Sequence, residues 1–340
     1  MKRILLISLM AVVVISIVFG GCAKSAPVQT ITWKFSGYSS EGSYPTNTLR
    51  WWADEVEKKT NGQLKIDVYI AGSSPYKSKE SLKSLRENLM EGAEVWAWAV
   101  GGEVQEIKVT SLPGFIPYGI EFREQLARDF ESDFAGIMAK HNAYLYAFVE
   151  SSERNIYLKE PANTLAEVKG RKLRSAGKEE QALSNNMGAV GTVMPGAEVY
   201  TSIQKGILDG VWHIDDTALT SKWYEILNYI VTTNWGGAGC YFCLNQTALD
   251  ALPKDVRDVV IDLQPKFKDV MFENLAKATK ESRATLLKEG MEEITWPKAD
   301  MDKLAELSNA IAMEWYQSTT PEAQKIYDKI EAYISKSGQR

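Results

Sequence analysis

Metal ligands and reactive thiols are scarce in this sequence. Its 340 residues include only three cysteines and two histidines, His141 and His213. His213 and Asp215 would share one face of a strand, but no further His or Cys lies nearby. A zinc site needs three or four convergent ligands. The sequence therefore predicts no metal site.

Two of the three cysteines form one Cys-x-x-Cys spacing, Cys240 and Cys243. This spacing occurs in redox sites and in half of a zinc site. A redox pair normally opens a helix, where the thiol pKa is lowered. Here the pair lies in the apolar run Gly-Cys-Tyr-Phe-Cys-Leu, which is typical of a strand. We interpret both residues as small buried side chains, and their redox role is left open.

The sequence also lacks the motifs of several large enzyme classes. It has no Gly-rich phosphate loop, no Gly-x-Ser-x-Gly and no His-Glu-x-x-His. The net charge is only −5, and no long basic run follows the first few residues, so nucleic acid is not an expected partner. We therefore expect a protein that is not an enzyme and holds no cofactor.

One long apolar run is present, and it lies at the N-terminus. Lys2-Arg3 is followed by the uncharged residues 4–19 and then by small residues. This pattern is typical of a secretory signal, and the run is shorter than the roughly 20 residues that span a bilayer. No second run of spanning length follows. We predict that residues 1–21 are a signal peptide.

Gly-Gly-Cys at the end of this segment resembles the lipobox of bacterial lipoproteins, although Phe19 departs from the usual Leu. The resemblance implies cleavage before Cys22 and acylation of that residue. Residues 22–30 would then be a tether. The expected location is periplasmic or extracytoplasmic, on a membrane through the lipid anchor.

Strand and helix patterns alternate along the rest of the chain. Strand patterns occur at 32–35, 64–70, 93–100 and 144–149, and helix patterns at 45–61, 79–90 and 123–140. This alternation predicts an α/β fold with a largely parallel sheet. A second unit of short strands and helices begins near residue 151. A long helical stretch then follows from 253 to about 289, with Pro265 expected to kink or break it.

Two arginines lie in short strand patterns of this second unit. Arg174 ends the strand pattern 172–175, and Arg154 begins another. Open α/β sheets bind ligands at the carboxyl ends of strands, and a guanidinium can grip a carboxylate with two parallel hydrogen bonds. The alternative is that Arg174 belongs to a solvated basic turn and binds no ligand, because Lys169 and Arg171 are close to it in the sequence. The order of residues alone does not decide which face of the strand meets a pocket.

The segments around these arginines resemble the DctP-type solute-binding proteins of TRAP (tripartite ATP-independent periplasmic) transporters. The closest matches are Gly-Arg-Lys-Leu-Arg-Ser-Ala-Gly at 170–177 and Met-Pro-Gly-Ala-Glu-Val-Tyr-Thr-Ser-Ile-Gln-Lys-Gly-Ile-Leu-Asp-Gly at 194–210. Tyr-Glu-Ile-Leu-Asn-Tyr at 224–229, Leu-Pro at 252–253 and the segment 62–70 also fit. Weak similarity covers residues 31–330.

The resemblance implies a two-lobed fold like that of periplasmic binding proteins, with a cleft between the lobes and a long helix across both. One lobe would hold 31–151 and 239–278, and the other 152–238 and 279–330. Residues 331–340 would be a C-terminal tail.

The resemblance also implies a function and a site. The protein would capture a small carboxylate and deliver it to the small and large membrane subunits of a TRAP permease. Arg174 would pair with the carboxylate, Arg154 would add a contact, and His213 would be a polar contact. The alternatives are a binding protein of an ATP-driven importer, a chemosensory receptor or a periplasmic enzyme.

Aromatic residues complete the predicted site. Trp212 and Trp235 lie in the second unit, and Trp96 and Trp98 are expected on one face of a strand of the first. Tyr38, just after the first strand pattern, is a further candidate. Together they favour an aromatic or otherwise apolar carboxylate as ligand.

Overall fold

The computed structural model describes residues 30–338. The predicted signal peptide, most of the tether and the acylation site at Cys22 lie outside the described residues. Within 30–338, no helix combines the length and the apolar character that a membrane span requires.

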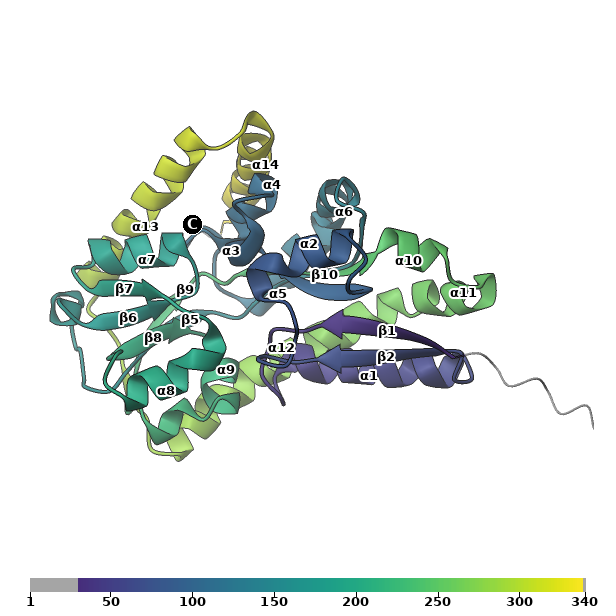
Figure 1. Cartoon of the computed structure of the whole chain (residues 1–340). Coiled ribbons are helices and arrows are strands. Elements are labelled where there is room, and N and C mark those ends of the chain that lie inside the picture. Colours follow the sequence, from purple (N-terminus) through teal and green to yellow (C-terminus); the bar gives the residue numbers. More distant parts are fainter. Residues whose placement is uncertain (1–29, 339–340) are drawn as a thin grey trace, which may run out of the picture.

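Two sheets organise the chain (Figure 1). The first has five strands in the order β2-β1-β3-β10-β4, with bounds Leu64–Tyr69, Ile31–Ser36, Gly92–Trp96, Gly239–Asn245 and Ala143–Glu150. β1 is parallel to β2 and β3, whereas β10 is antiparallel to both β3 and β4. The sheet is therefore mixed, not largely parallel as expected, because β10 returns from the other sheet.

The second sheet has six strands in the order β11-β9-β5-β8-β6-β7. Their bounds are Glu292–Ile294, Tyr229–Trp235, Arg154–Leu158, Gly210–His213, Lys172–Ser175 and Val190–Val193. β5 is antiparallel to its neighbours β8 and β9, and β6 is parallel to β7 and β8. We call the parts of the protein built on the two sheets the first lobe and the second lobe. The predicted α/β fold with two lobes is confirmed.

The chain crosses between the lobes along two adjacent segments, from β4 to β5 and from β9 to β10. Backbone hydrogen bonds join them: Ser151 N donates to Ala238 O over 3.1 Å, and Arg154 N donates to Gly236 O over 3.1 Å. A Cβ atom at Gly237 would lie 2.5 Å from Ser151 O, so only glycine fits this close approach.

Helix α1 (Tyr44–Lys59) shows why the first lobe forms. Leu49, Trp52, Ala53 and Val56 recur at helical spacing, and all four are buried, as the sequence predicted. The Trp52 ring packs against Phe35 of β1 and Tyr146 of β4. The apolar face of α1 thus covers the first sheet.

Helix α12 (Gln264–Lys288) crosses beneath both lobes (Figure 1). Phe267 and Met271 are buried in the core of the first lobe, and Leu286 is buried in that of the second. The preceding helix α11 (Lys254–Asp262) ends just before Pro265. The predicted break at this proline is confirmed, since its ring fits only the first turn of a new helix.

The C-terminal helices bear on the predicted lobe boundary at residue 330. Helix α13 (Lys298–Ser318) is followed by α14 (Pro321–Ser337), so residues 331–337 are the end of a helix and not a tail. Tyr327 of α14 stacks on Phe115 of the first lobe with ring centroids 4.4 Å apart, and Ile330 and Ile334 are buried there. The boundary at 330 is therefore wrong, because the apolar face of α14 covers the first lobe.

A second difference lies at the end of β3. This strand stops at Trp96, and Ala97–Val100 form the short helix α3. Trp96 and Trp98 therefore do not share a strand face, because a helix turns successive side chains by about 100°.

Short elements complete the two lobes. The helices are α2 (Ser81–Arg86), α4 (Gln105–Lys108), α5 (Ile120–Asp129), α6 (Glu131–Ala139), α7 (Lys178–Asn186), α8 (Val199–Gln204), α9 (Asp215–Thr220) and α10 (Gln246–Asp250). The 3-10 turns are Ser78–Glu80, Val109–Ser111, Leu165–Val168, Gly196–Glu198 and Trp223–Glu225.

Candidate functional site

The two lobes touch along a junction that holds the candidate site. Tyr44 N, at the start of α1, donates to Asp216 Oδ2 of α9 over 3.3 Å. Lys108 of α4 forms an ion pair with Glu179 of α7, and both side chains are buried. These contacts bring the carboxyl ends of β1 and β3 against the second lobe.

Arg174 lies on β6 and is 2% exposed. Its neighbour Leu173 points into the apolar core of the second lobe, so the arginine faces the other way. Arg174 Nε donates to Met194 O over 2.9 Å, while Nη1 is buried without a hydrogen-bond partner among the described residues. Burial lowers the pKa of Arg174 to about 10, which leaves it charged at neutral pH.

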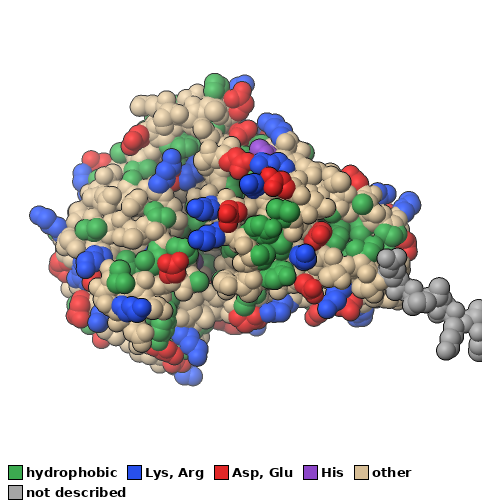
Figure 2. Space-filling view, in the orientation of Figure 1, with side chains coloured by type: hydrophobic (Ala, Val, Ile, Leu, Met, Phe, Trp, Pro, Cys, Tyr) green, Lys and Arg blue, Asp and Glu red, His purple; other side chains and the backbone are tan. Residues whose placement is uncertain are grey.

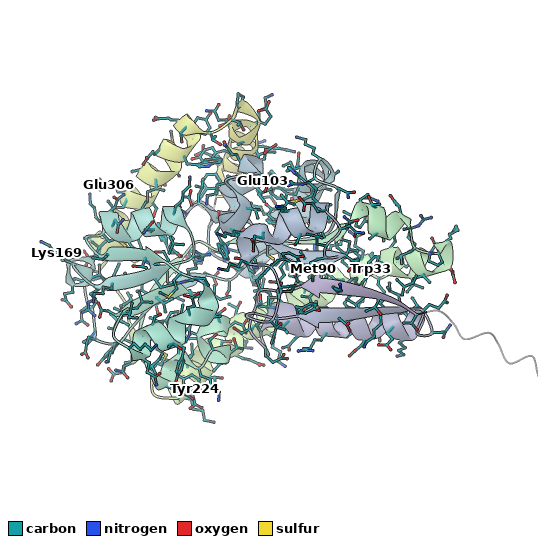
Figure 3. All side chains as sticks on the ribbon, in the orientation of Figure 1. Trp33, Met90, Glu103, Lys169, Tyr224 and Glu306 are labelled. Carbon is teal, nitrogen blue, oxygen red and sulfur yellow. The ribbon has the colours of Figure 1, made fainter. Side chains whose placement is uncertain are left out.

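The basic turn before β6 is separate from this site. Lys169 lies at the outer end of the second lobe, away from the first lobe (Figure 3). Arg171 donates to the backbone oxygens of Glu160, Pro161 and Glu167. Arg174 alone of these basic residues is fully buried, which argues against the alternative of a solvated basic turn.

Arg154 begins β5 beside Trp235 of β9. It forms an ion pair with Glu180, and the two side chains are 14% and 7% exposed. Glu180 also accepts a hydrogen bond from the backbone N–H of Ala176. The charge of Arg154 is therefore already balanced by a fixed carboxylate.

His213 ends β8, on the face opposite Trp212. Its Nδ1 atom is buried and lacks a hydrogen-bond partner in the described part of the chain. The pKa of His213 is lowered well below its usual value by burial and by the charges of Arg174 and Arg154. The imidazole is thus neutral at neutral pH and can donate or accept one hydrogen bond at Nδ1.

The two tryptophans of the second lobe are already engaged. Trp212 is 2% exposed in the apolar core, and its Nε1 donates to Ser184 Oγ over 3.2 Å. Trp235 Nε1 donates to Ser308 Oγ over 2.8 Å. Its ring lies against Gly114 of the first lobe, where a Cβ atom would come within 2.5 Å. Both rings also line a small cavity between the lobes, together with Arg154 and Ser111.

Trp98 and Tyr38 are the predicted site residues of the first lobe. A Cβ atom at Gly177 would lie 3.5 Å from Trp98 Cβ, so α3 meets the segment between β6 and α7. Tyr38 Oη is buried and unpartnered among residues 30–338, and burial raises its pKa. Trp98 therefore lies at the contact with the second lobe, whereas the contacts of Tyr38 are with residues of the first lobe.

Four further buried polar residues of the first lobe surround the junction, and the sequence reasoning missed them. They are Tyr44, Glu94, Arg123 and Glu150. Each has at least one buried side-chain atom without a partner among the described residues. The sequence does contain a signal for Glu94 and Glu150. Each is the one charged residue of an apolar strand pattern and lies near the carboxyl end of that strand.

The surface around the junction carries charges of both signs. Figure 2 shows acidic and basic side chains interspersed on this face, without a broad basic area. The described residues also contain no group of three or more potential metal ligands. The unpartnered atoms around the junction include both donors and acceptors, which are the groups that bind the polar atoms of a small molecule.

Comparisons with known proteins identify the family of this chain. The family described as "Bacterial extracellular solute-binding protein, family 7" (DctP) matches residues 35–319. A solute-binding protein of Albidiferax ferrireducens is 22% identical over 294 residues, which is 86% of this chain and 83% of the relative. The C4-dicarboxylate-binding periplasmic protein DctP of Rhodobacter capsulatus is 29% identical over 59% of this chain and 61% of its own length.

Solved structures show the same fold. The Bordetella pertussis receptor DctP7, which binds pyroglutamic acid, has a TM-score of 0.81 at 23% identity and covers 88% of this chain and 99% of its own. A TRAP solute-binding protein of Chromohalobacter salexigens with bound D-glucuronate has a TM-score of 0.79 at 20% identity, with coverages of 88% and 99%. Since the family match spans most of the sequence, this protein belongs to family 7 of the bacterial extracellular solute-binding proteins, the DctP family.

Proposed function

We propose that this protein is the extracytoplasmic receptor of a TRAP transporter, which captures a small organic acid between its lobes and delivers it to the membrane permease. Membership of this family favours a role with a TRAP transporter. The alternatives are a role with an importer driven by ATP and a role as a chemosensory receptor. The related structures of this fold hold acids that include pyroglutamate, glucuronate and succinate.

The observation that carries the proposal is the buried, unpartnered guanidinium edge of Arg174. A desolvated cation that lacks an anionic partner is costly, and a ligand carboxylate would supply that partner with charge-assisted hydrogen bonds. His213 lies on the same face of the sheet, two residues beyond Val211, which is the register partner of Arg174. It would add a neutral hydrogen bond, while Arg154 would act mainly through its pair with Glu180.

Arg174 and His213 favour binding of a ligand without a chemical reaction. The arginine side chain stays protonated at neutral pH, and His213 is held neutral by its surroundings. We infer that the protein is a receptor and not an enzyme. We further infer that Cys22 is acylated, so that the tether 22–30 holds the first strand, which begins at Ile31, close to a membrane.

A thermal-shift screen tests the function. The mature protein is mixed with pyroglutamate, D-glucuronate, succinate, D-erythronate and orotate, then with a wider set of organic acids, each beside its methyl ester. A bound acid stabilises the folded state, by about 2.7 kcal/mol at a hundred times its Kd, whereas the uncharged ester does not. Equal stabilisation by acids and esters would refute carboxylate recognition. Loss of the bound compound through conversion to a product would refute the receptor.

A further inference from the structure

We propose that Asp216 couples closing of the lobes to the uptake of a proton, so that Asp216 favours tighter ligand binding as the pH falls. This inference rests on the proposed function and adds its regulation by pH. Asp216 would act on affinity through the position of the lobes and without touching the ligand, which makes it a positioning residue.

The chain that follows β8 seats the second lobe on the first. This closing segment, Ile214–Ser221, consists of helix α9 and the residue at each of its ends. The Ile214 side chain is buried in the apolar core of the first lobe, although the strand before it belongs to the second sheet. At the other end, the hydroxyl groups of Ser221 and Ser40 form a hydrogen bond of 3.1 Å between the lobes. Both ends of the closing segment therefore lie at the contact between the lobes.

Asp216 lies within the closing segment and is 5% exposed. Its Oδ2 atom accepts a hydrogen bond from the backbone N–H of Tyr44 across the lobe contact, over 3.3 Å. Tyr44 is the first residue of α1, so this N–H has no acceptor inside its own helix. Because donor and acceptor belong to different lobes, separation of the lobes would break this hydrogen bond and admit water to the carboxyl group.

The Asp216 carboxyl group is buried without a cation. Arg283 of α12 serves the neighbouring carboxylate instead, because its Nε donates to Asp215 Oδ2 over 2.8 Å and its Nη2 donates to Asp215 Oδ1 over 3.1 Å. Arg283 also pairs with Glu293. Within residues 30–338, no Lys, Arg or His nitrogen forms an ion pair with Asp216 within 4.0 Å. An ionised Asp216 would thus lose its hydration without gaining an ion partner, which favours the neutral acid.

The other titratable groups on the elements around Asp216 do not balance its charge. Burial raises the pKa of the Tyr44 phenol well above its usual value, so this group stays neutral. His213 at the end of β8 is neutral as well, because burial lowers its pKa. Closing would therefore release a proton from His213 below about pH 6.5, which opposes the effect of Asp216. The charged side chains of α1 and of the neighbouring turns are exposed, and they are Glu41, Arg50, Lys222 and Glu225.

The direction of the effect follows from the pKa of Asp216. Burial raises this pKa from 3.8 to about 6, against the hydrogen bond from Tyr44 N and with the added effect of the Asp215 charge. In separated lobes, contact with water would return the pKa toward 3.8. The closed form thus binds the proton more tightly than the open form. The contribution of Asp216 to closing is complete below about pH 4 and is lost as the pH rises through about 6.

The competing explanation is that the ionised carboxylate latches the lobes through its hydrogen bond from Tyr44 N. A charged acceptor strengthens such a bond, so under this explanation Asp216→Asn weakens binding at pH 8. Under our proposal, burial of the charge costs more than this hydrogen bond contributes. Asn keeps an acceptor oxygen and carries no charge, so Asp216→Asn should tighten binding.

The first experiment is calorimetry at pH 5, 6 and 8 with pyroglutamate, D-glucuronate and succinate as probes. It compares the mature wild type with Asp216→Asn and with Asp302→Asn as a control. Asp302 pairs with Lys298 on the surface of α13, so its replacement removes an equal charge from an exposed site. The protons of His213 and of the probe contribute equally in all three proteins, so the ratio of affinities isolates Asp216.

At pH 8 we expect Asp216→Asn to bind the tightest probe about tenfold or more tightly than the wild type does. One pKa unit corresponds to a tenfold change, so the rise from 3.8 to about 6 sets an upper limit on the order of a hundredfold. This advantage should fall about tenfold between pH 8 and pH 5, as Asp216 of the wild type becomes protonated. Asp302→Asn should match the wild type throughout.

The outcomes separate this inference from the proposed function. Unchanged or weaker binding by Asp216→Asn at pH 8 would overturn the role of Asp216 and leave carboxylate capture intact. A constant ratio of the two affinities from pH 5 to pH 8 would do the same. Absence of binding with every acid of the thermal-shift screen would count against the proposed function, and the role of Asp216 is then tested without a ligand.

The second experiment is small-angle X-ray scattering from the three ligand-free proteins at pH 5 and pH 8, which also shows whether each variant is folded. At pH 8 we expect a smaller radius of gyration for Asp216→Asn than for the wild type, because its lobes close more readily. The difference should shrink at pH 5, and Asp302→Asn should match the wild type. Equal radii for the wild type and Asp216→Asn at both pH values would overturn the inference.

Discussion

Arg174 is oriented by the protein before a ligand binds. Arg174 and its neighbour Leu173 lie on opposite faces of β6. The hydrogen bond from Nε to Met194 O orients the guanidinium, while Nη1 is left without a partner among the described residues. This preorganisation reduces the conformational entropy that binding costs. The guanidinium should therefore contribute strongly to affinity.

Replacing Arg174 with Ala should weaken binding of the tightest carboxylate by on the order of thirtyfold to a few thousandfold, because the ligand carboxylate would be desolvated without its partner. Arg174→Lys should also fail substantially, since an ammonium cannot reproduce the planar fork. Lys172→Ala is the matched control, as Lys172 lies exposed on the same strand. Calorimetry measures all three, and unchanged affinity in Arg174→Ala would disprove the assignment.

Glu150 gives a prediction for stability against pH. Burial raises its pKa from 4.5 to about 8 in the folded protein. The unfolded chain therefore loses this proton first as pH rises. The stability contributed by protonated Glu150 is complete below about pH 4.5 and is lost as pH rises through about 8.

Glu150→Gln cannot lose that proton. Between pH 5 and pH 8 the ligand-free wild type should lose roughly 3 kcal/mol relative to this variant, at up to about 1.4 kcal/mol per pH unit. Thermal and urea unfolding of both proteins at pH 5, 6.5 and 8 measures the difference. Parallel pH curves for the two proteins would contradict the raised pKa of Glu150.

At the scale of elements, the contact between α4 and α7 joins the lobes. The side chains of Lys108 and Glu179 are 3% and 8% exposed, and burial lowers the pKa of Lys108 even beside its partner. A buried pair is strongly destabilised when one partner is removed, yet an apolar pair of similar volume often replaces it at little cost.

Lys108→Met should thus favour separation of the lobes, where Glu179 regains water, and should weaken ligand binding by about 3 kcal/mol, roughly a hundredfold. The double variant Lys108→Met/Glu179→Leu should recover affinity to within about tenfold. Lys329→Ala, which removes an exposed partner of Asp133, is the control and should bind normally. The idea fails if the single and double variants bind equally weakly.

At the scale of the whole molecule, α12 and the paired crossing segments connect the two lobes. We propose that the lobes close over the ligand as it binds. Delivery to a permease requires that the receptor stay near the membrane, which is the role we assign to the lipid on Cys22.

Cys22→Ala should move the protein from the membrane fraction to the released fraction, with ligand affinity unchanged. Cys240→Ala is the control, because Cys240 is buried in β10 far along the chain, and this variant should remain with the membrane. Fractionation with mass spectrometry of the N-terminus measures both effects. An unmodified Cys22 in the wild type would exclude the anchor.

Much of the element pattern follows from local sequence. The buried face of α1 and the break at Pro265 depend on residue spacing and on the proline ring, so they are predictable without tertiary contacts. The end of β3 at Trp96 and the packing of α14 on the first lobe are not, because they depend on surfaces contributed by distant segments.

By itself, the sequence determined the two-lobed α/β class, the family resemblance and the arginine on β6, since strand patterns and motif letters are local properties. Only the tertiary structure decided that Leu173 faces the core and Arg174 the junction, and that Trp212 is a packing residue. It also buried Glu94 and Glu150 in the first lobe. The burial of these side chains depends on the whole fold, because segments distant in the sequence cover them.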